Sequence, residues 1–121
     1  MTAYVIESAD VNQAEQTVVS KGLTARDAEV WQHHFPQFPV LPGVLMLDLL
    51  KATAEKWYGA GVRVINVRRV RFSNYLKPGA EWQGRMRLEN LSSEEGDRWS
   101  GEILSAGVKM ASAILTLSVK G

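Results

Sequence analysis

Residues 43–58 read GVLMLDLLKATAEKWY, and this stretch decides the fold class. It contains good helix formers and no proline, and glycines at positions 59 and 61 end it. Apolar side chains point to almost every side of the predicted helix, which is typical of a helix buried on most of its surface. Among its few polar residues, Asp48, Lys51 and Glu55 share one stripe. We therefore expect one long central helix that the rest of the chain covers.

The segments around this helix have the pattern of β-strands. One β-prone run precedes the helix and four follow it, separated by glycine- or proline-containing turns. A change of phase near residues 65–67 indicates either a β-bulge or a two-faced central strand. One helix with a series of strands predicts an α+β fold, in which an antiparallel sheet wraps the helix. The predicted strands are residues 16–23, 62–73, 82–91, 98–106 and 108–119.

The length of 121 residues predicts a single domain, residues 1–121. A chain this short has a small core when it folds alone, which favours an oligomer. There is no cysteine, so disulfides, thiolate metal ligands and a cysteine nucleophile are excluded. The two histidines are adjacent and no acidic cluster completes a ligand set, so we expect neither a metal nor a cofactor.

The sequence contains no signal for export or membrane insertion. The first ten residues lack a basic region followed by an apolar run. The longest uninterrupted apolar run is residues 44–47, far below the ~20 residues that span a bilayer. We therefore expect a cytoplasmic protein with no membrane insertion.

Charge is unevenly distributed, although the chain as a whole has a net charge of +1. Residues 63–87 contain six arginines and one lysine against one glutamate, a net charge of +6. Such a segment can attract an acidic partner. It can equally be the solvated face of a sheet, where charged side chains occupy alternate strand positions. The pattern alone leaves both interpretations open.

The motif that points to a function is residues 34–48, which read HFPQFPVLPGVLMLD. It resembles the signature of the 3-hydroxyacyl-acyl-carrier-protein dehydratases of bacterial fatty acid synthesis. In that family His-Phe-Pro precedes Pro-Val, a hydrophobe, Pro-Gly, and a helix with a carboxylate on its second turn. The family's spacing of 14 positions is matched by His34 and Asp48. The resemblance extends, with less specific matches, over about residues 17–119.

The resemblance implies a hot-dog fold, in which a curved antiparallel sheet wraps a long central helix, working as a dimer. Family members place the histidine of one subunit beside the acid of the other. The implied activity is elimination of water from a 3-hydroxyacyl thioester, giving a trans-2-enoyl thioester without a cofactor. The implied partner is acyl carrier protein with its phosphopantetheine-linked acyl chain, and the chain is expected to form a homodimer or a heterodimer. No nucleic-acid partner is expected.

The resemblance also assigns roles to individual residues. His34 takes the proton next to the thioester carbonyl, a suitable task for a group that titrates near neutral pH. Asp48, directly or through a water, helps the hydroxyl group leave. The thioester oxygen gains negative charge, and backbone N–H groups of Gly43 and Val44 at the helix start are its candidate donors. The resemblance places Phe35, Phe38 and Pro42 along the substrate tunnel.

The basic segment then has a specific interpretation, because acyl carrier protein is acidic. The residues expected to bind it are Arg68, Arg69, Arg71 and Lys77. Structural alternatives remain for the catalytic pair: His34 can be a packed histidine of a proline-rich segment, and Asp48 can pair with Lys51 one turn on.

The sequence departs from the family pattern at three places. Asp48 stands where the general dehydratases have glutamate, as in relatives that also isomerise the double bond. Gln37 stands where glycine is common, which bears on the width of the pocket. The Leu-Pro-His-Arg-like run of many members is missing, so we expect either a more open tunnel or an unusual partner protein. Two other functions stay in competition: a hot-dog thioesterase, and a catalytically silent subunit that binds acyl chains.

Overall fold

The computed structural model of the protein describes residues 3–26, 43–92 and 95–119. Within these ranges there is one helix, α2 (Gly43–Tyr58), which has the bounds that the sequence predicts. Six strands form a single sheet beside it, so the predicted α+β class is confirmed. The strands are β1 (Tyr4–Asn12), β2 (Thr17–Thr24), β3 (Val62–Phe72), β4 (Glu81–Ser92), β5 (Gly96–Ser105) and β6 (Val108–Val119).

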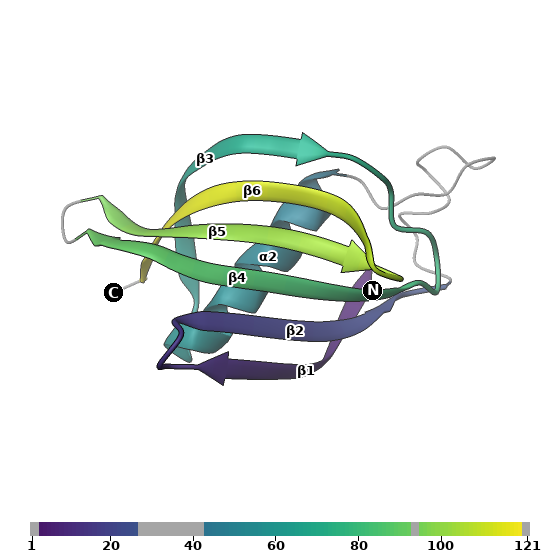
Figure 1. Ribbon diagram of the computed structural model, residues 1–121, viewed down its shortest axis with the longest axis horizontal. Coiled ribbons are helices and arrows are strands. Elements are labelled where there is room, and N and C mark those ends of the chain that lie inside the picture. Colours follow the sequence, from purple (N-terminus) through teal and green to yellow (C-terminus); the bar gives the residue numbers. More distant parts are fainter. Residues whose placement is uncertain (1–2, 27–42, 93–94, 120–121) are drawn as a thin grey trace.

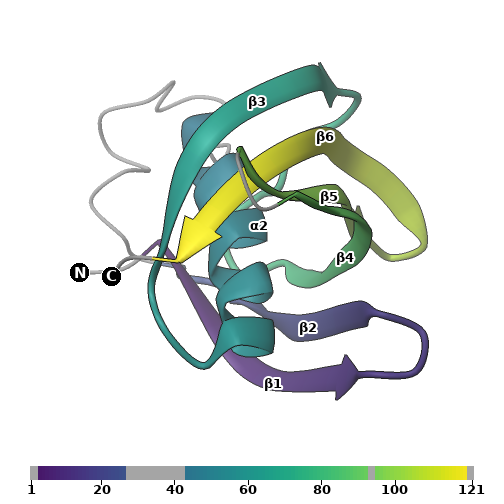
Figure 2. The same ribbon diagram turned by 90° about the vertical axis from the view of Figure 1, so that its left-hand side faces the viewer.

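Neighbouring strands of the sheet are antiparallel, in the order β1-β2-β4-β5-β6-β3. β1 and β3 are therefore its two edge strands. The sheet curves around α2, which lies on the concave side (Figure 1 and Figure 2). In the described ranges, no helix combines the length and the apolarity that are needed to cross a membrane.

β1 is a strand that the sequence pattern did not predict, so the expectation of five strands was wrong. Tyr4 and Ile6 are its two partly buried residues, and residues 7–12 are exposed. Its pairing with β2 also shifts register between Ile6 and Ser8. Because the alternation covers only three residues before this irregularity, it is too short to be distinguished from a loop.

β3 has a bulge, one of the two features that its change of phase indicates; the other, a two-faced central strand, is wrong because β3 lies at the edge of the sheet. Its register with β6 shifts between Val64 and Asn66, which leaves Ile65 unpaired. A second shift follows between Arg68 and Arg71, where Arg69 has a positive φ of 52°. A left-handed residue in a bulge increases the local bend of a strand. These two irregularities help β3 to curve around the helix.

The core lies between α2 and the concave face of the sheet. In β4 every second residue from Trp82 to Leu88 is buried and the arginines between them are exposed, as the alternation predicts. The buried side chains of the helix are Met46, Leu49, Leu50, Thr53 and Ala54. The buried apolar side chains of the last two strands are Trp99, Ile103, Ala111, Ala113, Leu115 and Leu117.

A buried polar contact fixes the helix on the sheet. The hydroxyl groups of Ser20 in β2 and Thr53 in α2 lie 2.6 Å apart, and Thr53 also donates to the carbonyl of Leu49. Both hydroxyl groups are thereby satisfied, as burial requires. Gly84 of β4 leaves room for the pair, because a Cβ atom there would lie 2.9 Å from Oγ1 of Thr53.

The helix is less buried than its composition predicts. Val44 is 71% exposed, and Asp48 and Lys56 are exposed as well. The sheet covers one side of α2 and leaves part of its first two turns open. The expectation of burial on nearly all sides is thus correct only for the side that faces the sheet.

Candidate active site

Asp48, the predicted catalytic acid, lies on the second turn of α2 with its side chain exposed. It does not belong to the buried face of the helix, which starts with Met46 and continues at Leu49. Its Oδ2 atom accepts a hydrogen bond of 2.6 Å from the hydroxyl group of Tyr4 in β1. The partner of Asp48 is therefore a residue of the sheet edge rather than Lys51, the neighbour on the same helix that the sequence offers.

Tyr4 is a site residue that the sequence analysis missed, because it lies in the strand that was not predicted. Its ring meets the indole of Trp82 edge-on, with ring centroids 6.1 Å apart and an angle of 86° between the planes. Such edge-to-face pairs are a preferred aromatic geometry. The sequence signal that could have found it is the run of an aromatic and two β-branched residues at positions 4–6.

The phenol of Tyr4 remains protonated. Partial burial raises the pKa of Tyr4 well above its ordinary value, and the hydrogen bond to the Asp48 carboxylate raises it further. Removing the proton would leave two negative charges in contact, which is unfavourable. Tyr4 is therefore a hydrogen-bond donor to Asp48 at neutral pH.

Gly43 and Val44, the predicted donors to the thioester oxygen, form the start of α2. Backbone N–H groups in the first turn of a helix have no partner within the helix, and they lie at its positive end. The Phe72 ring of β3 occupies the position beside Gly43, since a Cβ atom there would lie 2.7 Å from the ring. Gly43 thus lies in close contact with the Phe72 ring, and the close approach of a substrate to this backbone stays a prediction.

The other predicted residues of the active site, His34, Phe35, Phe38 and Pro42, lie outside the described residues, and so does Gln37. Their roles stay predictions. The described part of the candidate site therefore consists of the exposed Asp48, the Tyr4 that binds it, and the helix start with Phe72 beside it.

The predicted carrier-binding residues are all exposed. Arg68, Arg69 and Arg71 belong to β3 at the edge of the sheet, and Lys77 lies in the loop before β4. Two further arginines of the basic segment, Arg85 and Arg87, belong to β4. Their side chains point to the convex face of the sheet, away from α2, and form the solvated face of the alternative interpretation.

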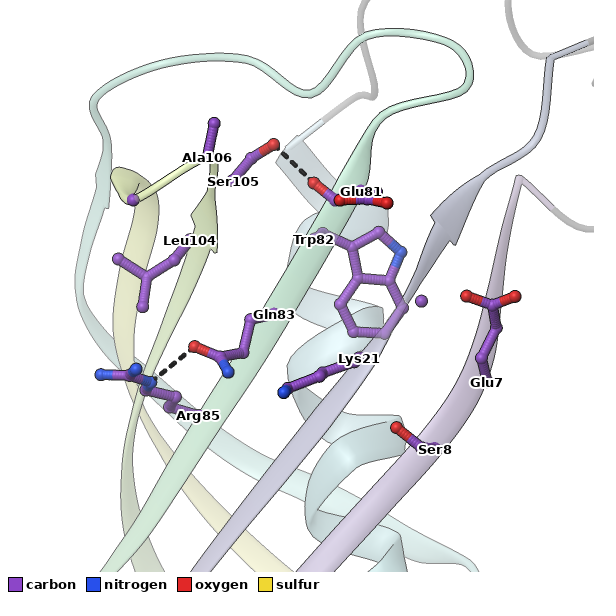
Figure 3. Close-up of a pocket in the computed structure, with 12 residues that line it drawn as sticks. Glu7, Ser8, Lys21, Glu81, Trp82, Gln83, Arg85, Leu104, Ser105 and Ala106 are labelled. Carbon is purple, nitrogen blue, oxygen red and sulfur yellow. Dashed lines mark hydrogen bonds between the residues drawn. The ribbon is translucent and has the colours of Figure 1, made fainter.

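A hollow of about 580 Å³ lies on the convex face of the sheet, at one end of β2 and β4 (Figure 3). Its walls include Lys21, Gln83 and Arg85, and Arg85 donates to Gln83 within it. The sheet separates this hollow from α2, and Asp48 does not line it. The hollow is therefore not the predicted active site. In the described ranges no group of His, Asp or Glu side chains could hold a metal ion.

A protein-family model described as ApeI dehydratase matches residues 10–106 of the chain. The chain belongs to the ApeI-like dehydratase family. The 3-hydroxyacyl-[acyl-carrier-protein] dehydratase FabZ of Lactiplantibacillus plantarum is 31% identical over 77 residues, 58% of this chain and 52% of that protein. FabZ of Oceanobacillus iheyensis is 25% identical over 118 residues, 92% of this chain and 83% of that protein. The match to the first of these relatives spans about half of its length.

Solved structures confirm the hot-dog fold. A chain of the dehydratase heterocomplex ApeI:P from Xenorhabdus doucetiae superposes with a TM-score of 0.77 and 16% identity, covering 96% of this chain and 98% of that chain. A putative thioesterase related to phenylacetic acid degradation, from Ralstonia eutropha, has a TM-score of 0.68 and 20% identity, covering 96% and 84%. Because dehydratase-like and thioesterase-like chains share this fold, the fold alone does not select the reaction.

Proposed function

We propose that this ApeI-like protein is a 3-hydroxyacyl-acyl-carrier-protein dehydratase, which removes water from a 3-hydroxyacyl thioester. The observation that carries the proposal is the exposed carboxylate of Asp48 on the second turn of α2, oriented by Tyr4. It stands at the family's spacing from His34 in the HFP motif.

In the proposed reaction, His34 takes the proton from the carbon next to the thioester carbonyl. The carbon–oxygen bond at the next carbon then breaks, and the leaving hydroxyl group takes up the proton that His34 removed, so that it departs as water. The Asp48 carboxylate, directly or through a water, accepts a hydrogen bond from the hydroxyl group and so orients it for this transfer. Negative charge that develops on the thioester oxygen is stabilised by N–H groups at the start of α2, where Gly43 and Val44 are the candidate donors. The products are the trans-2-enoyl thioester and water.

The test of this function is the identity of the product. Purified protein is given a 3-hydroxyacyl thioester of N-acetylcysteamine, and both enoyl absorbance and free thiol are followed. A dehydratase forms the enoyl thioester and releases no thiol. Release of thiol together with free acid would instead identify a thioesterase. If the protein binds the acyl thioester but converts none of it, the catalytically silent subunit would be favoured.

We further propose that the active protein is a dimer that pairs through β3. This edge strand carries exposed apolar side chains, which are Val64, Ile65, Val70 and Phe72, between 38% and 45% exposed. An edge strand with unpaired backbone groups is a template for a second chain, and apolar exposure in a small protein marks an interface.

Ile65→Lys is expected to convert the dimer to a monomer. Ile65 is the unpaired residue of the first bulge, so the substitution leaves the pairing of β3 with β6 intact while it adds charge to the proposed interface. Light scattering should give twice the chain mass of 13.4 kDa for the wild type and this single mass for the variant. A wild-type monomer, or a variant that stays dimeric, would refute the β3 interface. If the wild type reaches the mass of a dimer only after a second dehydratase chain is added, the protein forms a heterodimer.

The proposed partner is acyl carrier protein, which would contact the exposed arginines of β3. Replacing Arg68 and Arg71 together by glutamate should raise KM for the carrier-bound substrate by about tenfold or more at low salt. It should leave KM for the N-acetylcysteamine thioester unchanged, because that substrate lacks the acidic carrier. Arg85→Glu with Arg87→Glu, on the convex face, is the matched control. An unchanged KM for the carrier-bound substrate at low salt would disprove docking at β3.

A further inference from the structure

The hydrogen bond between Tyr4 and Asp48 joins the first strand to the central helix. Tyr4 comes from the first strand, and Asp48 from the helix 44 positions later. At 2.6 Å, the distance between the Tyr4 hydroxyl oxygen and Oδ2 of Asp48 is in the range of a charge-assisted O–H···O⁻ bond. Among the described residues, Oδ1 of Asp48 has no hydrogen-bond donor. The carboxylate therefore has one bound and one available oxygen.

The position of the Tyr4 hydroxyl group is determined by three strands. Tyr4 pairs with Thr24 of β2, and its ring lies edge-on against the buried Trp82 of β4. Gly22 of β2 makes this packing possible, since a Cβ atom there would lie 1.8 Å from the Val5 carbonyl oxygen and 2.7 Å from the Trp82 ring. β1 lies beside α2 in this arrangement (Figure 2). The Tyr4 hydroxyl group is thus held beside the helix by a strand that pairs with β2 and packs on Trp82.

An exposed aspartate on a helix ordinarily samples several side-chain rotamers. A catalytic group that is displaced by about 1 Å can lose about 100-fold in rate, because proton transfer requires a defined geometry. The Asp48 side chain has no other anchor among the described residues, so its orientation depends on Tyr4. The phenol is suited to this task, because burial raises its pKa and keeps it a donor.

We propose that Tyr4 is a positioning residue for Asp48: its hydroxyl group holds Oδ2 and so directs Oδ1 toward the leaving hydroxyl group of the substrate. This inference rests on the dehydratase function proposed above. It assigns the first strand a part in catalysis. Tyr4 itself contributes no atom to the reaction.

The test is Tyr4→Phe, which removes the hydroxyl group and keeps the ring that packs on Trp82. We expect kcat for dehydration of the N-acetylcysteamine thioester to fall about 10- to 100-fold, with KM within about twofold of the wild-type value. Loss of substrate binding would raise KM instead. An unchanged kcat in the folded variant would overturn the proposal.

Tyr58→Phe is the matched control. The Tyr58 hydroxyl group also donates to an aspartate, Asp97, at 2.5 Å, and in addition accepts from Nε1 of the buried Trp99 at 2.9 Å. Its removal leaves a buried donor without a partner, so this variant should lose at least as much stability as Tyr4→Phe. We expect its kcat to stay within about twofold of the wild-type value. An equal fall of kcat in both variants would mean that lost stability, not lost positioning, explains the effect.

A second measurement does not depend on activity. The three-bond couplings of the Asp48 carboxyl carbon to its backbone nitrogen and carbonyl carbon report the χ1 rotamer. We expect a single rotamer in the wild type and averaging in Tyr4→Phe, with Tyr58→Phe like the wild type. Asp48 couplings that do not change in Tyr4→Phe would overturn the proposal. A wild type with one Asp48 rotamer that becomes averaged in Tyr4→Phe, but with no dehydration, would instead refute the proposed function and leave the orientation of Asp48 by Tyr4 demonstrated.

Discussion

His34→Ala and Asp48→Asn are each expected to lower kcat for dehydration by about 10²- to 10⁴-fold, the usual contribution of a positioned acid or base. His34→Ala removes the group proposed to take the proton. Asp48→Asn keeps the size of the side chain and an oxygen that can accept from Tyr4, but it removes the ionisable acid. Absorbance of the enoyl product measures both effects. Substantial activity in His34→Ala would refute the proposed mechanism.

Co-expression of the two inactive variants provides a control that their folds are intact. If each site combines His34 of one subunit with Asp48 of the other, a mixed dimer contains one complete site and one that lacks both groups. We expect about half of the wild-type activity per mixed dimer when the two chains are purified through different tags. No recovery from a properly mixed dimer would place both groups in the same subunit.

Gly22→Ala is expected to lower the free energy of unfolding by about 3 kcal/mol or more, a large effect for overpacking by one methyl group. The new Cβ atom would lie 1.8 Å from the carbonyl oxygen of Val5 and 2.7 Å from the Trp82 ring. The first neighbour is backbone, so relief requires separation of β1 from β2. Denaturant unfolding measures the loss, and amide exchange should increase across β1. kcat should fall as well, because Tyr4 moves with this strand.

Gly59→Ala is the control for the introduction of a methyl group at a glycine. Gly59 follows α2 with a φ of +67°, and an added Cβ atom there would have no atom within 4 Å. Its free energy of unfolding should fall only by the ~1–2 kcal/mol that an alanine costs in the left-handed conformation. Amide exchange in β1 and kcat should not change. If both variants lose a similar free energy of unfolding, and the amides of β1 stay protected from exchange in both, the contact of Gly22 with β1 does not explain the loss of stability.

The helix and the later strands could be predicted because their patterns are local. Residues 43–58 contain helix formers between two clear ends, and β4 alternates buried and more exposed side chains from Trp82 to Leu88. The irregularity near Ile65 was visible as a change of phase, but the pairing of β3 with β6 was needed to distinguish a bulge from a two-faced central strand. β1 was missed because an edge strand with few partly buried side chains has almost no alternation to detect.

The missed strand also explains what was missed in the candidate site. Asp48 could be selected from its spacing to His34, but its partner Tyr4 is determined by a contact across 44 positions. Likewise, the contact of Gly43 with Phe72 of β3 could not be seen in the sequence. Such contacts depend on how the sheet closes around the helix. A motif therefore indicates which residues act but not which residues hold them in place.

The most direct test of the dehydratase function is the mass of the acyl chain on its carrier. Acyl carrier protein loaded with a 3-hydroxyacyl group is incubated with the purified protein, and the intact carrier is weighed by mass spectrometry. We predict a carrier lighter by one water, with the acyl chain still attached, and no such change with His34→Ala. A carrier that has lost the entire acyl chain, or one that stays unchanged, would contradict it.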